Sequence, residues 1–268
     1  MGESTVRRET VDLSVEAGAA TIVLNRPQTL NAWNGQFGTD LLAAVREAQD
    51  RDDVRAVLIT GAGRGFSSGA DLKERGFSGE DGRPDVYSVL TELYHPIMTT
   101  IRTMPKPVVA AVNGPAVGIG CSLALCCDLI LAAESAYFLL AFVNIGLVPD
   151  GGSSLFVPTR VGLARAAELA MLGERLPART ALEWGLINRV VSDDELAGAA
   201  DGLCARLAAG PTLSYAGAKR ELNNWLYARM DEQLDLEARL QQEMMGSADA
   251  VEGAVAFVER RPPRFQGR

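Results

Sequence analysis

Apolar residues recur along the chain at two different spacings, which predict strands and helices. Short apolar runs, either continuous or alternating with polar residues, predict strands. They cover residues 11–15, 20–24, 54–60, 108–112 and 129–132. Apolar residues three or four positions apart predict the helices between these strands. They include Phe37, Leu41, Leu42, Val45 and Ala48, and then Val86, Leu90, Leu93, Ile97 and Ile101. The order is a repeated strand-strand-helix unit, so we expect a mixed α/β fold without doubly wound alternation.

The second half of the chain differs, because from Leu163 onward the pattern is almost entirely helical. The extended segment there lies at residues 187–191. The predicted helices cover residues 163–172, 178–184 and 194–208 and continue to Val258. We therefore expect two parts, a core over residues 1–197 and a C-terminal helical region over residues 198–268.

Two glycine-rich bends follow predicted strands and open onto predicted helices. The first, residues 61–72, reads Gly-Ala-Gly-Arg-Gly-Phe-Ser-Ser-Gly-Ala-Asp-Leu, and the second, residues 113–122, reads Asn-Gly-Pro-Ala-Val-Gly-Ile-Gly-Cys-Ser. Glycine lets the backbone approach another group closely, and the first N–H groups of a helix have no intrahelical acceptor. Two such bends could direct two N–H groups at one oxygen that acquires negative charge, as in an oxyanion hole. For one bend alone, a turn that only packs a helix against its strand is the better interpretation.

The composition is that of an ordinary globular protein, and it excludes several classes. The 268 residues are 47% hydrophobic and 22% charged, with a formal net charge of -8. This negative charge argues against general binding to nucleic acids or to anionic membranes. No apolar run is long enough to cross a bilayer, and the N-terminus lacks the apolar segment of a signal peptide. We therefore expect a cytoplasmic protein.

The sequence also gives little support for a metal site or a dinucleotide-binding site. The four cysteines lack metal-site spacing and predict reduced, buried thiols. His95 is the only histidine, and its place in a helical pattern indicates a structural role. The glycines after residue 60 do not form a dinucleotide motif, because Phe66 occupies the position of its last glycine. The sequence therefore predicts no metal site and no bound cofactor.

Several short motifs occur in a fixed order along the chain. They are Asn25-Arg26-Pro27, the stretch Gly65–Lys73, Pro105-Lys106-Pro107, Asn113-Gly114 with Gly118-Ile119-Gly120-Cys121, Cys127-Asp128, and Gly-Leu-Val-Pro-Asp-Gly-Gly at residues 146–152. Each motif is weak alone, but the ordered set is highly specific. From about Thr10 to the C-terminus the chain resembles the crotonase, or enoyl-CoA hydratase/isomerase, superfamily. Residues 148–152 with Glu183-Trp184-Gly185-Leu186 are most similar to its phenylacetate-pathway isomerase branch.

The resemblance implies a fold, a ligand and an assembly. The β-β-α units would form a right-handed spiral core, and the C-terminal helices would make the contacts of a homotrimer or of a dimer of trimers. The substrate would be an acyl-CoA thioester, so coenzyme A would enter with the substrate and not as a resident cofactor. The C-terminal region would complete the CoA site. The basic cluster at residues 260–264 would then lie near the CoA phosphates, although a solvated tail explains it as well.

The same resemblance assigns roles to individual residues. The backbone N–H groups of Ala70 and Ile119 would be the two oxyanion donors, and only the N–H is required at position 119. Other substrate contacts would come from Gln28, Leu30, Ser68, Asp71, Leu72, Lys73, Gly118 and Phe142. The acyl pocket would be shaped by Tyr137, Leu139, Leu140, Asn144 and the segment at residues 76–84.

Two departures from the family pattern decide the expected chemistry. Hydratases of the family use two glutamates, and this chain has Ser122 and Phe142 at those positions. Hydration needs one group to activate water and another to deliver a proton. Asp150 is the remaining candidate, and a single carboxylate can move a proton between two carbons while an enolate is held. The sequence therefore favours a double-bond isomerase that uses Asp150.

Three alternatives stay open at this point. Asp150 follows Pro149 and precedes Gly151, and Pro-Asp-Gly is also ordinary turn chemistry. The protein could instead be an enoyl-CoA hydratase with altered acid and base residues. It could also be a binder that keeps the CoA-thioester pocket with little catalysis.

Overall fold

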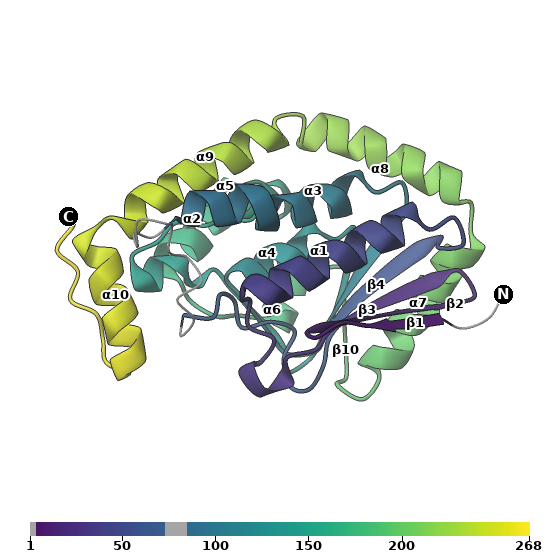
Figure 1. Ribbon diagram of the computed structural model, residues 1–268, viewed down its shortest axis with the longest axis horizontal. Helices are drawn as coiled ribbons and strands as arrows, with labels where there is room; N and C mark the ends of the chain where they lie inside the picture. The colour runs from purple at the N-terminus through teal and green to yellow at the C-terminus, as the bar shows by residue number, and fades with distance from the viewer. Residues whose placement is uncertain (1–3, 73–84) are drawn as a thin grey trace.

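A seven-stranded sheet forms the centre of the computed structural model, which describes residues 4–72 and 85–268 (Figure 1). The strand order is β1-β2-β3-β4-β5-β7-β10. Strands β1 to β3 pair antiparallel, and the pairs from β3 to β10 are parallel. The strands are β1 Ser4–Arg7, β2 Val11–Glu16, β3 Ala19–Leu24, β4 Ala56–Gly61, β5 Val108–Val112, β7 Leu129–Ala133 and β10 Arg189–Val191. Two expected features, a substrate contact at Lys73 and the pocket segment at residues 76–84, lie outside the described residues.

The burial of the strands follows their apolar patterns. Strands β2 and β3 alternate buried and half-buried residues, as their period of two predicts. Strand β5 is buried throughout and β4 over its first four residues, which explains their continuous apolar runs. Helix α1 (Gly35–Asp50) packs on β2 and β3, and α7 (Leu196–Ala209) packs on β4, β5 and β7. The expected boundary between the core and the C-terminal helical region, at residue 197, falls within α7. This boundary stays a prediction.

A second, three-stranded sheet was not visible in the sequence. It is formed by β6 (Pro115–Val117), β8 (Tyr137–Leu139) and β9 (Leu176–Pro177). Its strands have two or three residues each, which is too short for a period of two to be recognised. The sheet matters because β6 leads directly into helix α4 (Ile119–Cys126), the helix that begins at the second glycine-rich bend.

The predicted helices are present, with two corrections. The first is that the helical segment before Pro105 is divided into α2 (Val86–Val89), a π-helical turn (Leu90–Tyr94) and α3 (His95–Thr103). The second is that α5 spans Ser153–Leu172 with a kink at Gly162, whose φ and ψ are not helical, so the predicted helix from Leu163 follows the kink and a further helical part precedes it. The first half of α5 was missed because Pro158 and Gly162, with φ of 76°, lie inside α5 and are normally helix-ending residues. Helix α6 (Ala178–Glu183) follows close to its predicted position.

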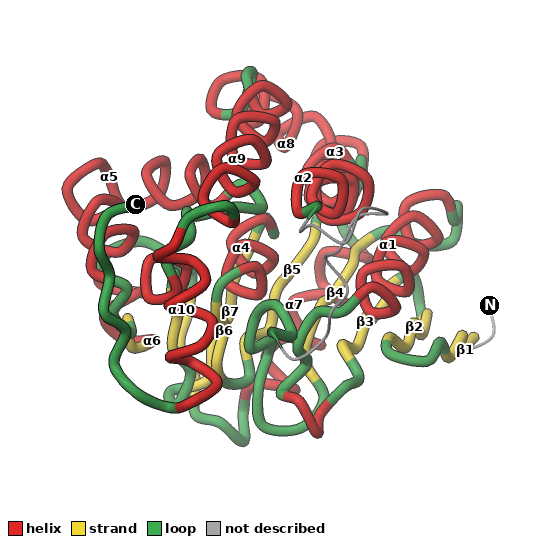
Figure 2. Tube along the Cα trace, turned by 60° about the vertical axis from the view of Figure 1, so that its left-hand side comes forward, coloured by secondary structure: helices red, strands yellow, loops and turns green. Residues whose placement is uncertain are grey.

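The C-terminal helices extend along one side of the molecule. Helices α8 (Thr212–Leu226) and α9 (Met230–Met245) follow one another along the top of the view in Figure 1, and α10 (Ala248–Glu259) lies at its left edge. Helix α9 contacts α2 and α5, and α10 contacts the short 3-10 helix Ala141–Ile145. Figure 2 shows α9 and α10 on the side of the molecule where α4 lies. The end of the chain therefore packs against the segments that follow the second bend.

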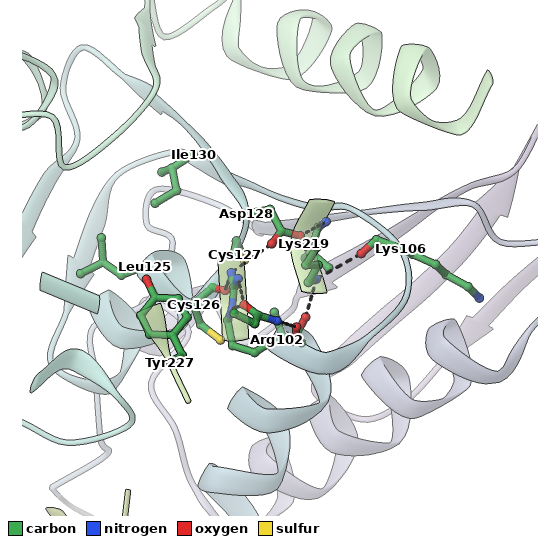
Figure 3. A network of polar contacts seen from close by, with 12 residues as sticks. Arg102, Lys106, Leu125, Cys126, Cys127, Asp128, Ile130, Lys219 and Tyr227 are labelled. Atoms are coloured by element: carbon green, nitrogen blue, oxygen red, sulfur yellow. Dashed lines mark hydrogen bonds and ion pairs between the residues drawn. The ribbon is translucent and has the colours of Figure 1, made fainter. Parts of the chain in front are cut away.

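A buried charged network holds the C-terminal end of α4 (Figure 3). The Asp128 carboxylate pairs with Arg102 at 3.0 Å and with Lys219 at 2.8 Å. Arg102 and Arg160 also donate hydrogen bonds to the last carbonyl groups of α4 and to the residue after it. Cations are favourable at the negative end of a helix. This network fixes α4 from its C-terminus, so Asp128 has a structural role.

The remaining candidate chemical groups are also buried in the core. All four cysteines are free and buried, as predicted, and burial raises the pKa of Cys121 to about 12. His95 is buried, and this burial lowers its pKa to about 4. In the described part of the chain, no helix is both long and apolar enough to span a membrane.

Candidate active site

The two glycine-rich bends lie side by side. They are joined by a parallel β-bridge between Ser67 and Ala116. The Ser67 N–H donates to the Pro115 carbonyl at 2.9 Å, and the Ser67 carbonyl accepts from the Val117 N–H at 2.9 Å. Sequence alone left open whether the bends meet, and the structure brings them together.

Glycine is required where the two bends approach each other. A Cβ atom at Gly120 would lie 2.5 Å from the Cβ of Ser67, a distance that real side chains do not reach. At Gly69 the φ angle is 90°, and a Cβ would lie 3.0 Å from the Val117 carbonyl oxygen. Gly118 has φ of 53° and would place a Cβ 3.9 Å from the Gly69 Cα. The glycines of the motif therefore allow backbone-to-backbone contact between the bends.

The first bend is held in place by the buried side chain of Asn31. Its amide donates to the carbonyl groups of Ala62 and Gly65 at 3.0 and 2.8 Å, and its carbonyl accepts from the Arg26 N–H at 2.8 Å. Each polar atom of this side chain therefore has a partner, which makes its burial favourable. Asn31 fixes the first bend against the end of β3.

The predicted contacts near residue 28 lie beside this bend, but they do not line the cavity described below. The Ser68 N–H donates to the Leu30 carbonyl at 2.9 Å, so the turn that contains Gln28 is adjacent to the bend. The Gln28 side chain is exposed. Asp71 lies in a loop and pairs with Arg26 at 3.3 Å. Gln28, Leu30 and Asp71 stay predicted substrate contacts.

A cavity of about 390 Å³ opens next to the two bends. The predicted site residues that line it are Ser68, Ala70, Leu72, Gly118, Ile119, Phe142 and Asp150. Most of the other lining side chains are apolar, and they come from the α2 segment, β8, α9 and α10. Tyr137, Leu139 and Asn144 line it as expected. Leu140 does not, because it is buried in the hydrophobic core instead.

Two backbone N–H groups beside the cavity, those of Ala70 and Ile119, take no part in the backbone hydrogen bonds that join the neighbouring described segments. Ala70 bridges Trp33, but that bridge uses the Gly69 carbonyl and the Asp71 N–H, at 2.8 Å each. Ile119 is the first residue of α4, where an N–H has no intrahelical acceptor. Both residues line the same cavity. The geometry therefore agrees with two backbone donors that serve one ligand.

Asp150 is the carboxylate that lines this cavity, among the residues that the structure describes. It is 6% exposed. Its Oδ2 accepts a hydrogen bond from the Gln241 amide at 2.7 Å, and its Oδ1 has no partner within the described chain. The pKa of Asp150 is raised to about 8, mainly by burial; the Gln241 hydrogen bond opposes this shift and the nearby Glu237 adds to it. The group can therefore hold or release a proton near neutral pH.

The main chain at Asp150 is fixed independently of its side chain. The hydroxyl groups of Ser122 and Ser153 donate to the Asp150 carbonyl at 2.7 and 2.8 Å. Ser122 occupies one hydratase glutamate position and is fully buried, while Phe142 at the other position presents a ring to the cavity. Neither position supplies an acid or a base.

Two functional candidates on α9 were missed by the sequence analysis. Gln241 contacts Asp150, and the buried Glu237 accepts hydrogen bonds from the Gly152 and Ser154 N–H groups at 2.7 and 3.1 Å. Burial raises the pKa of Glu237 to about 7, and these hydrogen bonds oppose the shift. The two residues are four positions apart and so share one helix face. That spacing was the available signal, but nothing in the sequence indicated that this face meets residues 148–154.

A family model described as enoyl-CoA hydratase/isomerase matches residues 14–268. The chain belongs to this family. The 1,2-epoxyphenylacetyl-CoA isomerase of Escherichia coli is 41% identical over 254 residues, which are 95% of this chain and 97% of the relative. A probable enoyl-CoA hydratase of Rhodobacter capsulatus is 41% identical over 259 residues, which are 97% of this chain and 98% of the relative.

Solved structures of the family share the fold. The enoyl-CoA hydratase from Mycobacterium avium subsp. paratuberculosis superposes with a TM-score of 0.87 at 40% identity, over 96% of this chain and 98% of that structure. The enoyl-CoA hydratase/isomerase from Pseudoalteromonas atlantica has a TM-score of 0.85 at 33% identity, over 96% of this chain and 100% of that structure. The predicted crotonase-like α/β class, with its β-β-α units and C-terminal helices, is confirmed. The similarity to the 1,2-epoxyphenylacetyl-CoA isomerase confirms the expected resemblance to an isomerase of the phenylacetate-pathway branch.

Proposed function

We propose that this member of the enoyl-CoA hydratase/isomerase family shifts a carbon–carbon double bond in an acyl-CoA thioester through an enolate. The observation that carries the proposal is Asp150, a buried carboxyl group with one unpaired oxygen in the cavity beside the two glycine-rich bends. Two relatives are named isomerases: the Escherichia coli protein above and the trans-2-decenoyl-[acyl-carrier-protein] isomerase of Streptococcus mutans, at 35% identity.

In this mechanism the thioester carbonyl oxygen accepts hydrogen bonds from the N–H groups of Ala70 and Ile119. Loss of a proton next to the carbonyl carbon moves negative charge to that oxygen, so donors placed there stabilise the enolate more than the substrate. One such donor typically contributes about 3 kcal/mol to lowering the barrier. The predominantly apolar cavity strengthens these interactions because it excludes water.

Asp150 is the proton carrier of the proposed reaction. Its carboxylate takes a proton at one carbon, the carbon–carbon double bond re-forms one position along, and the carboxyl group then delivers a proton to the other end of the allylic system; in D₂O the carboxyl proton can exchange with solvent between the two transfers. No net proton is gained or lost, so one carboxyl group is sufficient. Because burial raises the pKa of Asp150 to about 8, the basic form grows as pH rises to that value. The rate of proton abstraction should therefore increase from pH 6 to about pH 8.

A hydratase is the second candidate, supported by the relatives named hydratases. It would need a second acid or base in the cavity, and in the described part of the chain Asp150 supplies the one carboxyl group among the lining residues. The isomerase accounts for this lining without a further group. A CoA-thioester binder with little catalysis is the third candidate, and nothing in the cavity favours it over the isomerase.

The proposal also includes the ligand and the assembly expected from the family. Coenzyme A enters with the substrate, so no resident cofactor is required. Arg261 lines the cavity and pairs with Glu252 and Glu259 at 2.6 Å each, so a CoA phosphate that binds it would compete with these two carboxylates. We extend the proposal to a homotrimer or a dimer of trimers that acts in the cytoplasm, with no nucleic acid or membrane partner.

The test is hydrogen–deuterium exchange at the α-carbon of a bound acyl-CoA in D₂O, compared between the wild type and Asp150→Asn. The proposal expects the variant to bind acyl-CoA with unchanged affinity and to lose exchange by a factor of at least about 100. Unchanged exchange in the variant would mean that Asp150 is only a turn residue and not the proton carrier. Hydration of crotonyl-CoA should be slow in the wild type, and rapid hydration would favour the second candidate.

A further inference from the structure

One side chain from the C-terminal helix α9 makes direct contact with Asp150. Gln241 is 2% exposed, lines the cavity and is engaged at both ends of its amide. Its Oε1 accepts from the Val148 N–H at 3.1 Å, and its Nε2 donates to Asp150 Oδ2 at 2.7 Å. Because a backbone donor occupies the carbonyl end, the amide has one orientation, with its N–H end toward the carboxyl group.

We propose that Gln241 is a positioning residue, which holds Asp150 by Oδ2 and thereby leaves Oδ1 for the substrate. The inference rests on the proposed role of Asp150 as the proton carrier. The Ser122 and Ser153 hydroxyl groups already fix the main chain at this position, so the side-chain torsion angles are what Gln241 adds. A carboxyl group held by one oxygen presents the other in a defined direction, which is what proton transfer to and from carbon requires.

Gln241 also bears on the charge of Asp150. Its hydrogen bond favours the ionised carboxylate, against the effect of burial. Glu237, one turn earlier on α9, is the charged group that acts on Asp150 among the described residues, and its negative charge opposes ionisation. Without Gln241, both carboxyl oxygens would be buried without a donor, and the basic form would require a higher pH.

A matched control exists on the same helix. Gln233 lies eight residues before Gln241, and its Nε2 donates to the Ser154 hydroxyl at 2.9 Å. It thus makes a comparable hydrogen bond to the start of α5, just after Asp150, but it does not contact Asp150 or line the cavity. A purely structural role for Gln241 predicts that both glutamines have similar effects when replaced. A positioning role predicts that Gln241 alone changes the pH profile.

The experiment measures α-carbon exchange of a bound acyl-CoA from pH 6 to pH 10 in wild type, Gln241→Met and Gln233→Met. In Gln241→Met the rising limb of the profile, the range in which the exchange rate increases with pH, should shift to higher pH by about one unit, because a hydrogen bond to a charged group is lost. The rate at pH 7 should then fall roughly tenfold, with acyl-CoA affinity unchanged. Gln233→Met should keep the wild-type limb.

Gln241→Glu provides a second variant of nearly the same shape. It can still accept from Val148, but it places another acidic group against Asp150, so its limb should move to higher pH than that of Gln241→Met. A limb that stays at the wild-type pH in both Gln241 variants would overturn the proposal. If Asp150→Asn loses exchange while the Gln241 variants keep the wild-type profile, only this inference fails. If Asp150→Asn keeps exchange, the proposed function fails.

Discussion

Replacing Asp150 by Asn should make the protein more stable at alkaline pH while removing its activity. The pKa of the Asp150 carboxyl group rises from its ordinary value of 3.8 to about 8 in the folded state, mainly because the group is buried. Between these values the folded state binds more protons than the unfolded state, so the free energy of unfolding of the wild type falls as pH rises. Asn is neutral throughout and does not contribute this loss. The stability difference in favour of the variant should therefore grow with pH.

The size of this effect follows from the same shift. Each pKa unit corresponds to 1.36 kcal/mol, so the interval from pH 5 to about pH 8 corresponds to about 4 kcal/mol. Glu237 remains in both proteins, and its repulsion of the Asp150 carboxylate is already part of this shift. The predicted gain of Asp150→Asn over the wild type between pH 5 and pH 9 is thus on the order of 4 kcal/mol.

Denaturant unfolding at a series of pH values, at one fixed protein concentration, measures this difference. Asp53→Asn is the matched control, because Asp53 is exposed and its pKa is lowered by Arg51. Asp53 is already ionised at pH 5 in both states, so its replacement should give a difference that does not change from pH 5 to pH 9. A pH-independent difference for Asp150→Asn would refute the reasoning, since it would mean that the buried carboxyl group titrates as in water.

Two further predictions concern the scaffold of the site. Asp128→Asn should lower the free energy of unfolding by about 3–5 kcal/mol, because it leaves Arg102 and Lys219 buried without their carboxylate. Glu232→Gln, which breaks an exposed pair with Arg229, should cost less than about 1 kcal/mol in the same denaturant titration. Gly120→Ala should separate the two bends, lower stability by about 1–3 kcal/mol and reduce α-carbon exchange, because its Cβ would lie 2.5 Å from Ser67 Cβ. Gly198→Ala in α7 has open space and should be neutral or stabilising; a similar result at both glycines would contradict the account.

Much of the fold could be predicted because its signals are local. The apolar periods identified the long strands and helices, and the glycine-rich bends were recognisable from composition and position. The prediction of secondary structure failed where the local sequence signal differs from the structure that the chain adopts. Pro158 disfavours a helix interior, yet residues 153–161 are helical up to a kink at Gly162, so the helix before Leu163 was missed. The short strands β6, β8 and β9 are set by pairing partners and not by their own sequence.

The site was predicted where one motif contains its own chemistry, and missed where distant segments meet. Asp150, Ala70 and Ile119 lie in motifs and line one cavity. Gln241 is 91 residues from Asp150 in sequence, and its side chain resembles an ordinary polar residue of an amphipathic helix. The raised pKa of Asp150 depends on burial that no local pattern encodes. Contacts of this kind become visible only when the chain is folded.

The central claim is that N–H groups from the two bends, at Ala70 and Ile119, stabilise the same developing negative charge. Ile119 permits a direct test, because proline has no N–H and is well tolerated at the first position of a helix. Ile119→Val keeps the N–H and serves as the control for the shortened side chain. The measurement is the rate of α-carbon exchange of a bound acyl-CoA in the two variants. The account predicts that Ile119→Pro, with its fold intact, is slower than Ile119→Val by a factor of about 100–1,000. Equal rates in the two variants would contradict it.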